Sequence, residues 1–327
     1  MKPVWNRTNW LGLALCAITL FGALLYRISL PAPEEKNAAG AGDPEPAQVG
    51  VPAPGNVPAD GAERSASVSS VFLRLVDRES AYWQRFRALQ ELPWGELEEP
   101  EIRFLVDYLE CASAGVSDPL GEFSLRNDVL RGLIDLRADP EILLGVLLAV
   151  PQEKDAHHVL WREYVLQHYS IFLQDYQTDG LLGEDPQRSL VGELERHLNE
   201  TQTGIAGTAL LNMHRLRGID GSRYGGLPVE PAAIALATDP DAAPASRIAA
   251  AALLPDRYFE SAFGEALDLL SSGEANMVFK AALLRRALEA SASIPLPGGR
   301  VRLREAVAAQ DSRILKNILG DDTDNEI

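Results

Sequence analysis

From about Ser67 onward, apolar residues recur three and four positions apart, the spacing that places side chains on one face of an α-helix. The first such stretch ends at Pro93-Trp94-Gly95 and carries Val68, Phe72, Leu75, Tyr82, Trp83, Phe86 and Leu89. A second stretch carries Ile102, Leu105, Val106 and Leu109, with Gly115 as its stop signal. No convincing run of alternating β-branched residues occurs, so the pattern predicts an all-α body with roughly ten to twelve helices of ordinary length.

Acidic residues and prolines mark the predicted helix starts. Asp139-Pro140-Glu141 combines a side-chain cap, a proline at the first helical position and an acid in the first turn, and Asp185-Pro186 repeats this arrangement. Glu96, Glu98, Glu99 and Glu101 surround Pro100, where interaction with the helix dipole is a sufficient explanation for four carboxylates. Further apolar stripes follow at Leu190/Val191/Leu194/Leu198, Ile248/Ala252, Phe259/Phe263/Leu267/Leu270 and Val278/Leu284/Leu288.

The N-terminal 27 residues have the pattern of a membrane anchor. Residues 8–26 are uncharged and, as a helix, span about 28 Å, close to the thickness of the hydrocarbon layer. Lys2 and Arg7 precede this segment, whereas Arg27 alone follows it before Glu34 and Glu35. The positive-inside bias therefore predicts a single-pass membrane protein with a cytoplasmic N-terminus and an extracytoplasmic body, for which a bacterial periplasm is the expected setting.

The alternative for this segment is a cleaved signal peptide, which would leave a secreted protein. Such peptides usually have an apolar stretch of about 7–15 residues followed by an Ala-x-Ala site. Here the stretch is longer, and the good site, Ala39-Gly40-Ala41, lies far downstream. The length favours the uncleaved anchor.

Residues 28–66 are predicted to be a disordered linker. Residues 31–66 alone contain seven prolines and five glycines, and they have no aromatic residue. Too little apolar surface is available to offset the entropy of ordering such a segment. We expect an extended spacer that holds the body away from the membrane.

The helices of the body show a degenerate repeat. Residues 246–254, SRIAAAALL, align with residues 276–284, NMVFKAALL, and residues 126–133 have a related pattern. These segments resemble HEAT repeats and similar α-solenoid sequences, in which small residues let paired helices approach closely. The resemblance covers about residues 98–319 and implies an irregular helical-repeat array. The sequence pattern divides the body into a helical subdomain at 67–217, a Gly-rich connection at 218–228, a HEAT-like helical subdomain at 229–319 and an acidic tail at 320–327.

Charge and cysteine content exclude several kinds of site. After residue 27 the chain holds 27 basic and 47 acidic residues, a balance that disfavours nucleic-acid binding. Cys16 lies in the apolar segment and Cys111 is alone in the body, so neither a disulfide within the body nor a thiolate zinc site is expected. Cys111 follows Val106 and Leu109 and is interpreted as a small core residue.

Histidines and aromatic residues gather on residues 157–172. Trp161, Tyr164, Val165, His168, Ile171 and Phe172 share one predicted helix face. His168 or His197 has the side chain of a ligand or base, but a histidine on an apolar stripe is more often a hydrogen-bonded core residue. The stripe has two interpretations, a core face or an exposed partner-binding surface that includes Trp161, Tyr164 and His168. The core interpretation is favoured, because burial is the commoner use of aromatic stripes.

The Gly-rich residues 218–226 also have two interpretations. Flexible glycines near Asp220, Arg223 and Tyr224 are compatible with a binding site, but a simple connection between helical subdomains is the commoner use. No nucleotide-binding, acyl-transfer or paired-histidine metal motif occurs in the sequence, so no catalytic residue, metal or cofactor is predicted.

Two functions remain. The first is a membrane-anchored, non-enzymatic interaction or scaffold module whose partner is another envelope protein. The second is an extracytoplasmic enzyme that uses dispersed carboxylates on an all-α scaffold. A deep pocket that gathers carboxylates or histidines would favour the enzyme, and a shallow apolar-aromatic groove would favour the binding module.

Overall fold

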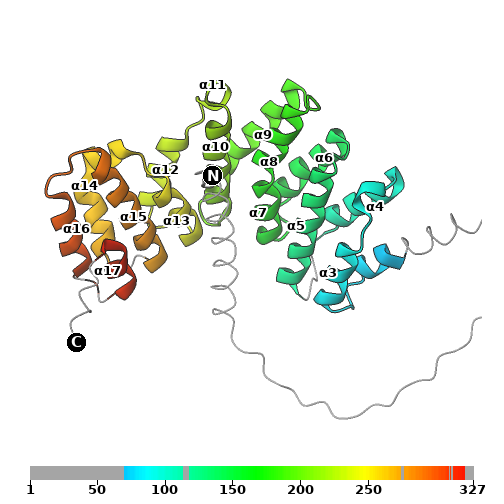
Figure 1. The fold of residues 1–327 in the computed structure, drawn as a ribbon, viewed down its shortest axis with the longest axis horizontal. Helices are drawn as coiled ribbons and strands as arrows, with labels where there is room; N and C mark the ends of the chain where they lie inside the picture. The colour runs from blue at the N-terminus through cyan, green and yellow to red at the C-terminus, as the bar shows by residue number, and fades with distance from the viewer. Residues whose placement is uncertain (1–69, 113–117, 274–275, 309, 311, 321–327) are drawn as a thin grey trace, which may run out of the picture. The chain divides into compact units, whose positions relative to one another are not determined.

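The computed structural model describes residues 70–112, 118–273, 276–308, 310 and 312–320, and every regular element in them is helical (Figure 1). The all-α prediction is therefore confirmed for this part of the chain. Fifteen α-helices, α3 to α17, occur there besides the helical residues 70–76, more than the ten to twelve predicted, in part because α11 has only four residues and α17 only seven. The chain forms two units, Met1–Leu92 (unit 1) and Pro93–Ile327 (unit 2).

Unit 1 has two short helices in its described part, residues 70–76 and α3 (Tyr82–Gln90). The prediction of one continuous helix through this region was wrong. The Asp77 carboxylate accepts hydrogen bonds from the Glu79 N–H at 3.1 Å and the Ser80 hydroxyl at 2.6 Å, and this local turn ends the first helix. Tyr82 and Trp83, which the pattern placed on the apolar stripe, are exposed.

Unit 2 contains all the other elements. It begins with a 3-10 helix, η1 (Trp94–Glu96), and continues through the following α-helices: α4 (Glu99–Glu110), α5 (Pro119–Asp135), α6 (Pro140–Gln152), α7 (Val159–Gln167), α8 (Tyr169–Thr178), α9 (Glu184–His197), α10 (Ile205–Ile219), α11 (Gly221–Tyr224), α12 (Val229–Thr238), α13 (Pro244–Ala252), α14 (Asp256–Ser271), α15 (Met277–Ser293), α16 (Gly299–Ala308) and α17 (Arg313–Leu319).

These helices pack in succession. α5 contacts α7, α7 contacts α10, α10 contacts α13, α13 contacts α15, and α15 contacts α17. The intervening helices pack beside this series, as α4 and α6 do on each other and α14 and α16 do farther along (Figure 1). α10 contacts α7, α8, α9, α11, α12 and α13, so it is the centre of the packing in unit 2.

Several helix ends follow the predicted local chemistry. The Asp139 side chain accepts a hydrogen bond from the Glu141 N–H at 2.8 Å, which confirms Asp139 as the cap of α6. The Glu101 carboxylate accepts from the Glu98 N–H at 2.7 Å at the start of α4, so the acidic cluster serves the helix terminus as predicted. Asp185, in contrast, lies inside α9, whose N-cap is Gly183.

The interpretation of Cys111 as a core residue was wrong. α4 ends at Glu110, and Cys111 is its exposed C-cap. The carbonyl oxygen of Cys111 accepts a hydrogen bond of 2.7 Å from Arg126. This hydrogen bond from Arg126 helps to hold the C-terminal end of α4 against α5, while the Cys111 thiol faces solvent.

Small residues let α10 and α13 of unit 2 approach each other closely. A Cβ atom placed on Gly207 of α10 would lie 2.7 Å from the Cα atom of Ser246 on α13. The Gly207 N–H donates to the Ser246 hydroxyl at 2.9 Å. The two segments aligned by sequence fall on α13 and α15, which pack on each other. The predicted Ile248/Ala252 face of α13 was wrong, because Ala252 is exposed and the buried positions are Ser246, Ala249, Ala250 and Ala251.

The predicted anchor, the predicted linker and the acidic tail from residue 321 lie outside the described residues, as does the stop signal Gly115. Within the described helices, none combines the length and the apolar character needed to cross a bilayer. The Gly-rich residues 218–228 include the end of α10 and the whole of α11. The division into subdomains at 67–217 and 229–319 stays a prediction.

Candidate functional site

A buried polar cluster joins α7, α9 and the loop before α10. The Glu200 carboxylate accepts two hydrogen bonds of 2.9 Å from one terminal nitrogen of Arg162. Lys154 lies 3.3 Å from the same carboxylate, and the Arg162 Nε donates to the Pro151 carbonyl at 2.8 Å. The Arg162 side chain is 4% exposed, so its charge is balanced mainly by Glu200.

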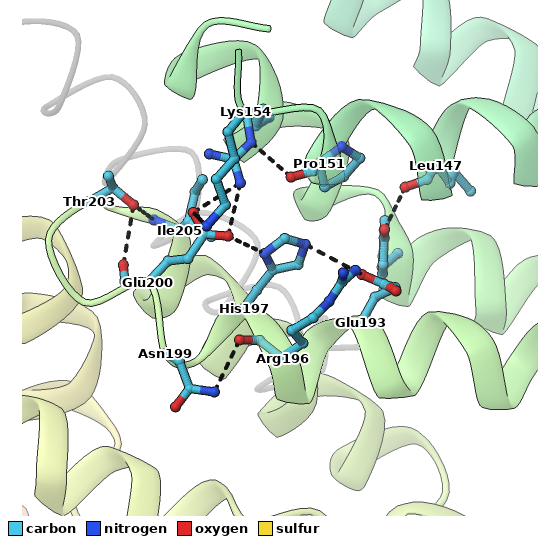
Figure 2. Close-up of polar contacts among 12 residues, drawn as sticks. Leu147, Pro151, Lys154, Glu193, Arg196, His197, Asn199, Glu200, Thr203 and Ile205 are labelled. Atoms are coloured by element: carbon cyan, nitrogen blue, oxygen red, sulfur yellow. Dashed lines mark hydrogen bonds and ion pairs between the residues drawn. The ribbon is translucent and has the colours of Figure 1, made fainter. Parts of the chain in front are cut away.

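His197 extends the cluster along α9. Figure 2 shows its ring between Glu200 and Glu193, and its Nδ1 lies 2.6 Å from a Glu200 oxygen. Its Nε2 lies 3.7 Å from a Glu193 oxygen, which is beyond hydrogen-bond distance. Glu193 forms an ion pair with Arg196. We call Arg162, Glu193, His197 and Glu200 the polar junction.

The protonation states in the polar junction favour an ion pair and a neutral histidine. Burial acts to raise the pKa of Glu200, but hydrogen bonds from Arg162 and His197 outweigh it and hold that pKa below its usual value. Burial lowers the pKa of His197 despite the nearby Glu200 carboxylate. Neutral His197 can donate its Nδ1–H to Glu200, which then accepts from two sides.

Glu163, next to Arg162 on α7, has the most perturbed carboxyl group of this region. Burial raises its pKa to about 7, while a hydrogen bond from the Gly204 N–H and the charge of Arg162 act in the opposite direction. The loop that contains Gly204 also packs on the following helices. The Thr201 carbonyl accepts from the Ala243 N–H at 2.7 Å, and the Thr203 carbonyl accepts from the Ser246 hydroxyl at 2.7 Å. The polar groups here tie α7 and α9 to α13.

The predicted aromatic stripe on residues 161–172 is a core face. Trp161, Val165 and Phe172 are fully buried, and His168 is 5% exposed with its Nε2 2.9 Å from the Asn127 oxygen. The core interpretation of the stripe is therefore confirmed, and Tyr164 is only partly exposed. That Trp161, Tyr164 and His168 bind a partner stays a prediction. The side chains of Trp161 and His168 are buried in this fold.

Trp161 belongs to a site that the sequence analysis missed. The buried Arg126 guanidinium lies 5.3 Å from the ring centre of Tyr108, and 5.8 Å from those of both Phe123 and Trp161. Its Nε donates to Glu122 at 3.0 Å within α5. Glu122 and Arg126 are four residues apart, so the spacing of an ion pair was visible, but the same spacing is common on exposed helix faces. Only the tertiary packing shows that this pair is enclosed.

The second predicted cluster, Arg223 and Tyr224, lines a surface groove. This groove has a volume of about 600 Å³ and is bounded by Glu184, Gln187, Arg188, Val191, Gly192 and Glu195 of α9, by Arg223 and Tyr224 of α11, and by Gly226 and Leu227. We call it the α9–α11 groove. Both α9 and α11 pack on α10, which fixes its walls (Figure 1).

The floor and the rim of the α9–α11 groove differ in character. Gln187, Tyr224 and Leu227 are buried, and the Tyr224 hydroxyl donates to the Gln177 side chain at 3.2 Å. Glu184, Arg188, Glu195 and Arg223 are exposed at the rim. The Asp220 side chain accepts from the N–H groups of Ser222 and Arg223, both at 3.1 Å, and so starts the short helix that presents Arg223.

One helix therefore serves both features. The face of α9 with Leu190, Glu193, Leu194 and His197 points to the core and the polar junction. The face with Arg188, Val191 and Glu195 borders the groove. Positions three or four apart share a helix face, which explains the division.

No group of three His, Cys, Asp or Glu side chains that could hold a metal ion occurs in residues 70–320 outside the gaps given above. Comparisons of the chain with protein-family models, with curated proteins and with solved structures find no significant match.

Proposed function

We propose that this protein is a membrane-anchored, non-enzymatic interaction or scaffold module of the cell envelope, and that the α9–α11 groove holds a segment of a partner protein. The observation that carries the proposal is the composition of the groove, in which Tyr224 and Leu227 lie beside Gln187 at the floor, inside a charged rim. Protein interfaces commonly have this arrangement, in which the centre supplies burial and the polar rim supplies specificity.

Arg223 defines the kind of segment that fits. Its side chain is exposed at the rim and forms no ion pair within the described residues, whereas Arg188 is paired with Asp185. Leu227 and Tyr224 lie beside it at the floor. The occupant is an extended or helical segment that places an apolar side chain on this floor and an acidic group beside Arg223.

The finer architecture belongs to the same proposal. The contact series α5, α7, α10, α13, α15 and α17, with other helices packed beside it, supports a HEAT-like α-solenoid. Arrays of this kind present extended surfaces to partners. The uncharged residues 8–26 support an anchor that places this array outside the cytoplasm.

Site-specific photo-crosslinking in intact membranes tests the groove. A photoreactive amino acid at Gly226 of the full chain should crosslink to one partner, and the same group at Val301, an exposed position on α16, should not. Arg223→Glu should reduce the crosslink at least tenfold, and Arg313→Glu, an equal charge change at an exposed position of α17, should leave it unchanged. Equal crosslinking in both variants would contradict the groove assignment.

Protease treatment of spheroplasts tests the topology. External protease should remove the body, and sequencing of the membrane-bound product should find the original N-terminus. A mature chain that begins after residue 27 would instead support the secreted alternative.

Glu163 is the observation that favours the enzyme alternative, because a carboxyl with a pKa near 7 suits general acid-base chemistry. The Glu163 carboxyl also accepts a hydrogen bond from the Gly204 N–H, so Glu163 has a structural role as well. Hydrolysis of model esters or glycosides by the full chain, abolished by Glu163→Gln, would establish the enzyme and overturn the scaffold proposal.

A further inference from the structure

The described part of unit 1 exposes several large apolar side chains. Eight large apolar residues are exposed in the described part of the chain, and three of them, Leu73, Tyr82 and Trp83, fall within residues 70–92. Trp83 is 61% exposed, Leu73 is 65% exposed and Tyr82 is 40% exposed. Tyr82 stacks on Phe86 with ring centres 5.9 Å apart, so the first two turns of α3 carry three neighbouring aromatic side chains. We call Tyr82, Trp83 and Phe86 the α3 aromatic surface.

Unit 1 also differs from the rest of the body in charge. Residues 70–92 contain four arginines and three acidic residues, whereas residues 93–327 contain 21 basic and 38 acidic residues. Arg87 follows Trp83 by one helical turn, and both are exposed. A bilayer surface with anionic lipids therefore repels the acidic residues 93–327, whereas residues 70–92 have no excess of negative charge to be repelled.

We infer that the α3 aromatic surface rests on the headgroup region of the lipid bilayer, an inference that depends on the membrane anchor of the proposed function. Tryptophan and tyrosine are enriched at this depth, because their rings are apolar and their N–H and O–H groups remain hydrated. Arginine beside them can reach lipid phosphates. Among possible occupants, a lipid surface matches both the aromatic composition and the charge contrast.

The position of α3 in the chain supports the same occupant. The predicted linker, residues 28–66, lies in the sequence between the predicted span and the described helices, and a flexible coil of this length would extend roughly 35 Å on average. A surface tethered at this distance encounters the membrane at an effective concentration on the order of millimolar. A weak affinity for the bilayer interface is then sufficient for continuous contact. A few side chains can keep α3 at the membrane, whereas a peripheral protein without an anchor needs a longer amphipathic helix.

Lipid quenching of Trp83 tests the inference in the full chain. The protein is reconstituted into vesicles of phosphatidylcholine and phosphatidylglycerol that contain a lipid with a spin label near the headgroup. Subtracting the fluorescence of Trp83→Phe from that of the unchanged protein isolates Trp83 from the other tryptophans. We expect the lipid label to quench Trp83 at least twofold, and the vesicle surface to shield it from acrylamide in water.

A matched pair of variants controls for charge and folding. Tyr82→Glu adds a charge in the first turn of α3, where an acidic residue is compatible with the helix dipole, and should abolish the lipid quenching of Trp83. Ile314→Glu makes the same change at an exposed apolar position in the first turn of α17 and should leave the quenching intact.

Each other outcome overturns the inference. Trp83 that is open to acrylamide and unquenched by lipid shows a solvated surface. Trp83 that is shielded from acrylamide but unquenched by lipid shows a protein occupant, such as a second copy of the chain. A chain that floats with vesicles without Trp83 quenching refutes this contact alone, and a chain that does not float refutes the anchor as well.

Discussion

Glu200 balances the charge of the buried Arg162 side chain, so the stability of the fold should depend strongly on the Glu200 carboxylate. Arg162 is 4% exposed and Glu200 is 14% exposed. Glu200→Gln preserves the shape but leaves Arg162 buried without its counter-charge, so the free energy of unfolding should fall by about 3 kcal/mol. Urea unfolding measures this change. Glu99→Gln removes the exposed partner of Arg103 and should change the same quantity by about 0.5 kcal/mol or less; similar losses in both variants would refute the role of Glu200.

His168 should make stability depend on pH. Burial, together with the charges of Arg131 and Arg215, lowers its pKa to about 3. In the unfolded chain this pKa is about 6.5, so between these values the unfolded state holds a proton that the folded state lacks. The stabilisation is complete above about pH 6.5 and is lost, by up to about 1.4 kcal/mol per pH unit, as the pH falls toward 3.

His168→Gln isolates this contribution, because glutamine can donate to Asn127 but does not titrate. Unfolding in urea between about pH 7 and pH 5 should show a shallower pH dependence for the variant than for the unchanged protein. Parallel curves would mean that His168 titrates normally in the folded state.

At the residue scale, sequence reasoning succeeded where the cause is local. The cap at Asp139 depends on its own turn, so its three-residue signature was sufficient to predict it. Cys111 was misassigned because its neighbours continue the apolar spacing, while the end of α4 and the bond to Arg126 are set by the packing of α5. Arg223 and Tyr224 share a groove because α11 lies near α9, a tertiary relation that no local pattern encodes.

At the scale of elements, the contact between α10 and α13 depends on glycine. Gly207→Ala would bring a methyl group within 2.7 Å of the Ser246 backbone, so the two helices must separate. The free energy of unfolding should fall by about 1–3 kcal/mol, as measured by urea unfolding. Gly145→Ala in α6, where a Cβ meets nothing within 4 Å, should instead raise it by about 0.5–1 kcal/mol. A stabilised Gly207→Ala variant would show that the helices are not closely packed.

Helix positions were largely predictable, because apolar spacing and capping residues act within a few positions. The break after residue 76 was not predicted, because the apolar spacing continues across it while Asp77, Glu79 and Ser80 form a competing turn. The exposed side of α13 was also misread, since a run of alanines has no distinct apolar face. Which helices contact each other was not predicted, because the aligned segments at 246–254 and 276–284 indicated a repeat without showing that α13 and α15 pack together.

At the scale of the whole molecule, the linker should contribute nothing to the stability of the body. A chain that begins at Ser67 retains every described residue, and the removed linker has too few apolar side chains to pack. Its free energy of unfolding should match that of the full chain within about 0.5 kcal/mol. Circular dichroism with urea measures both the helix content and the unfolding. A loss greater than about 1 kcal/mol would show that the linker docks on the body.

The sequential helix contacts of unit 2 have a consequence for synthesis. Its principal helix contacts join helices no more than three places apart in the chain. Local contacts need little loop closure, and chains leave the ribosome or a translocation channel from the N-terminus onward. Each newly emerged helix therefore finds its earlier neighbours already present. Only the short segment that has emerged but not yet packed needs chaperones to protect it at any moment.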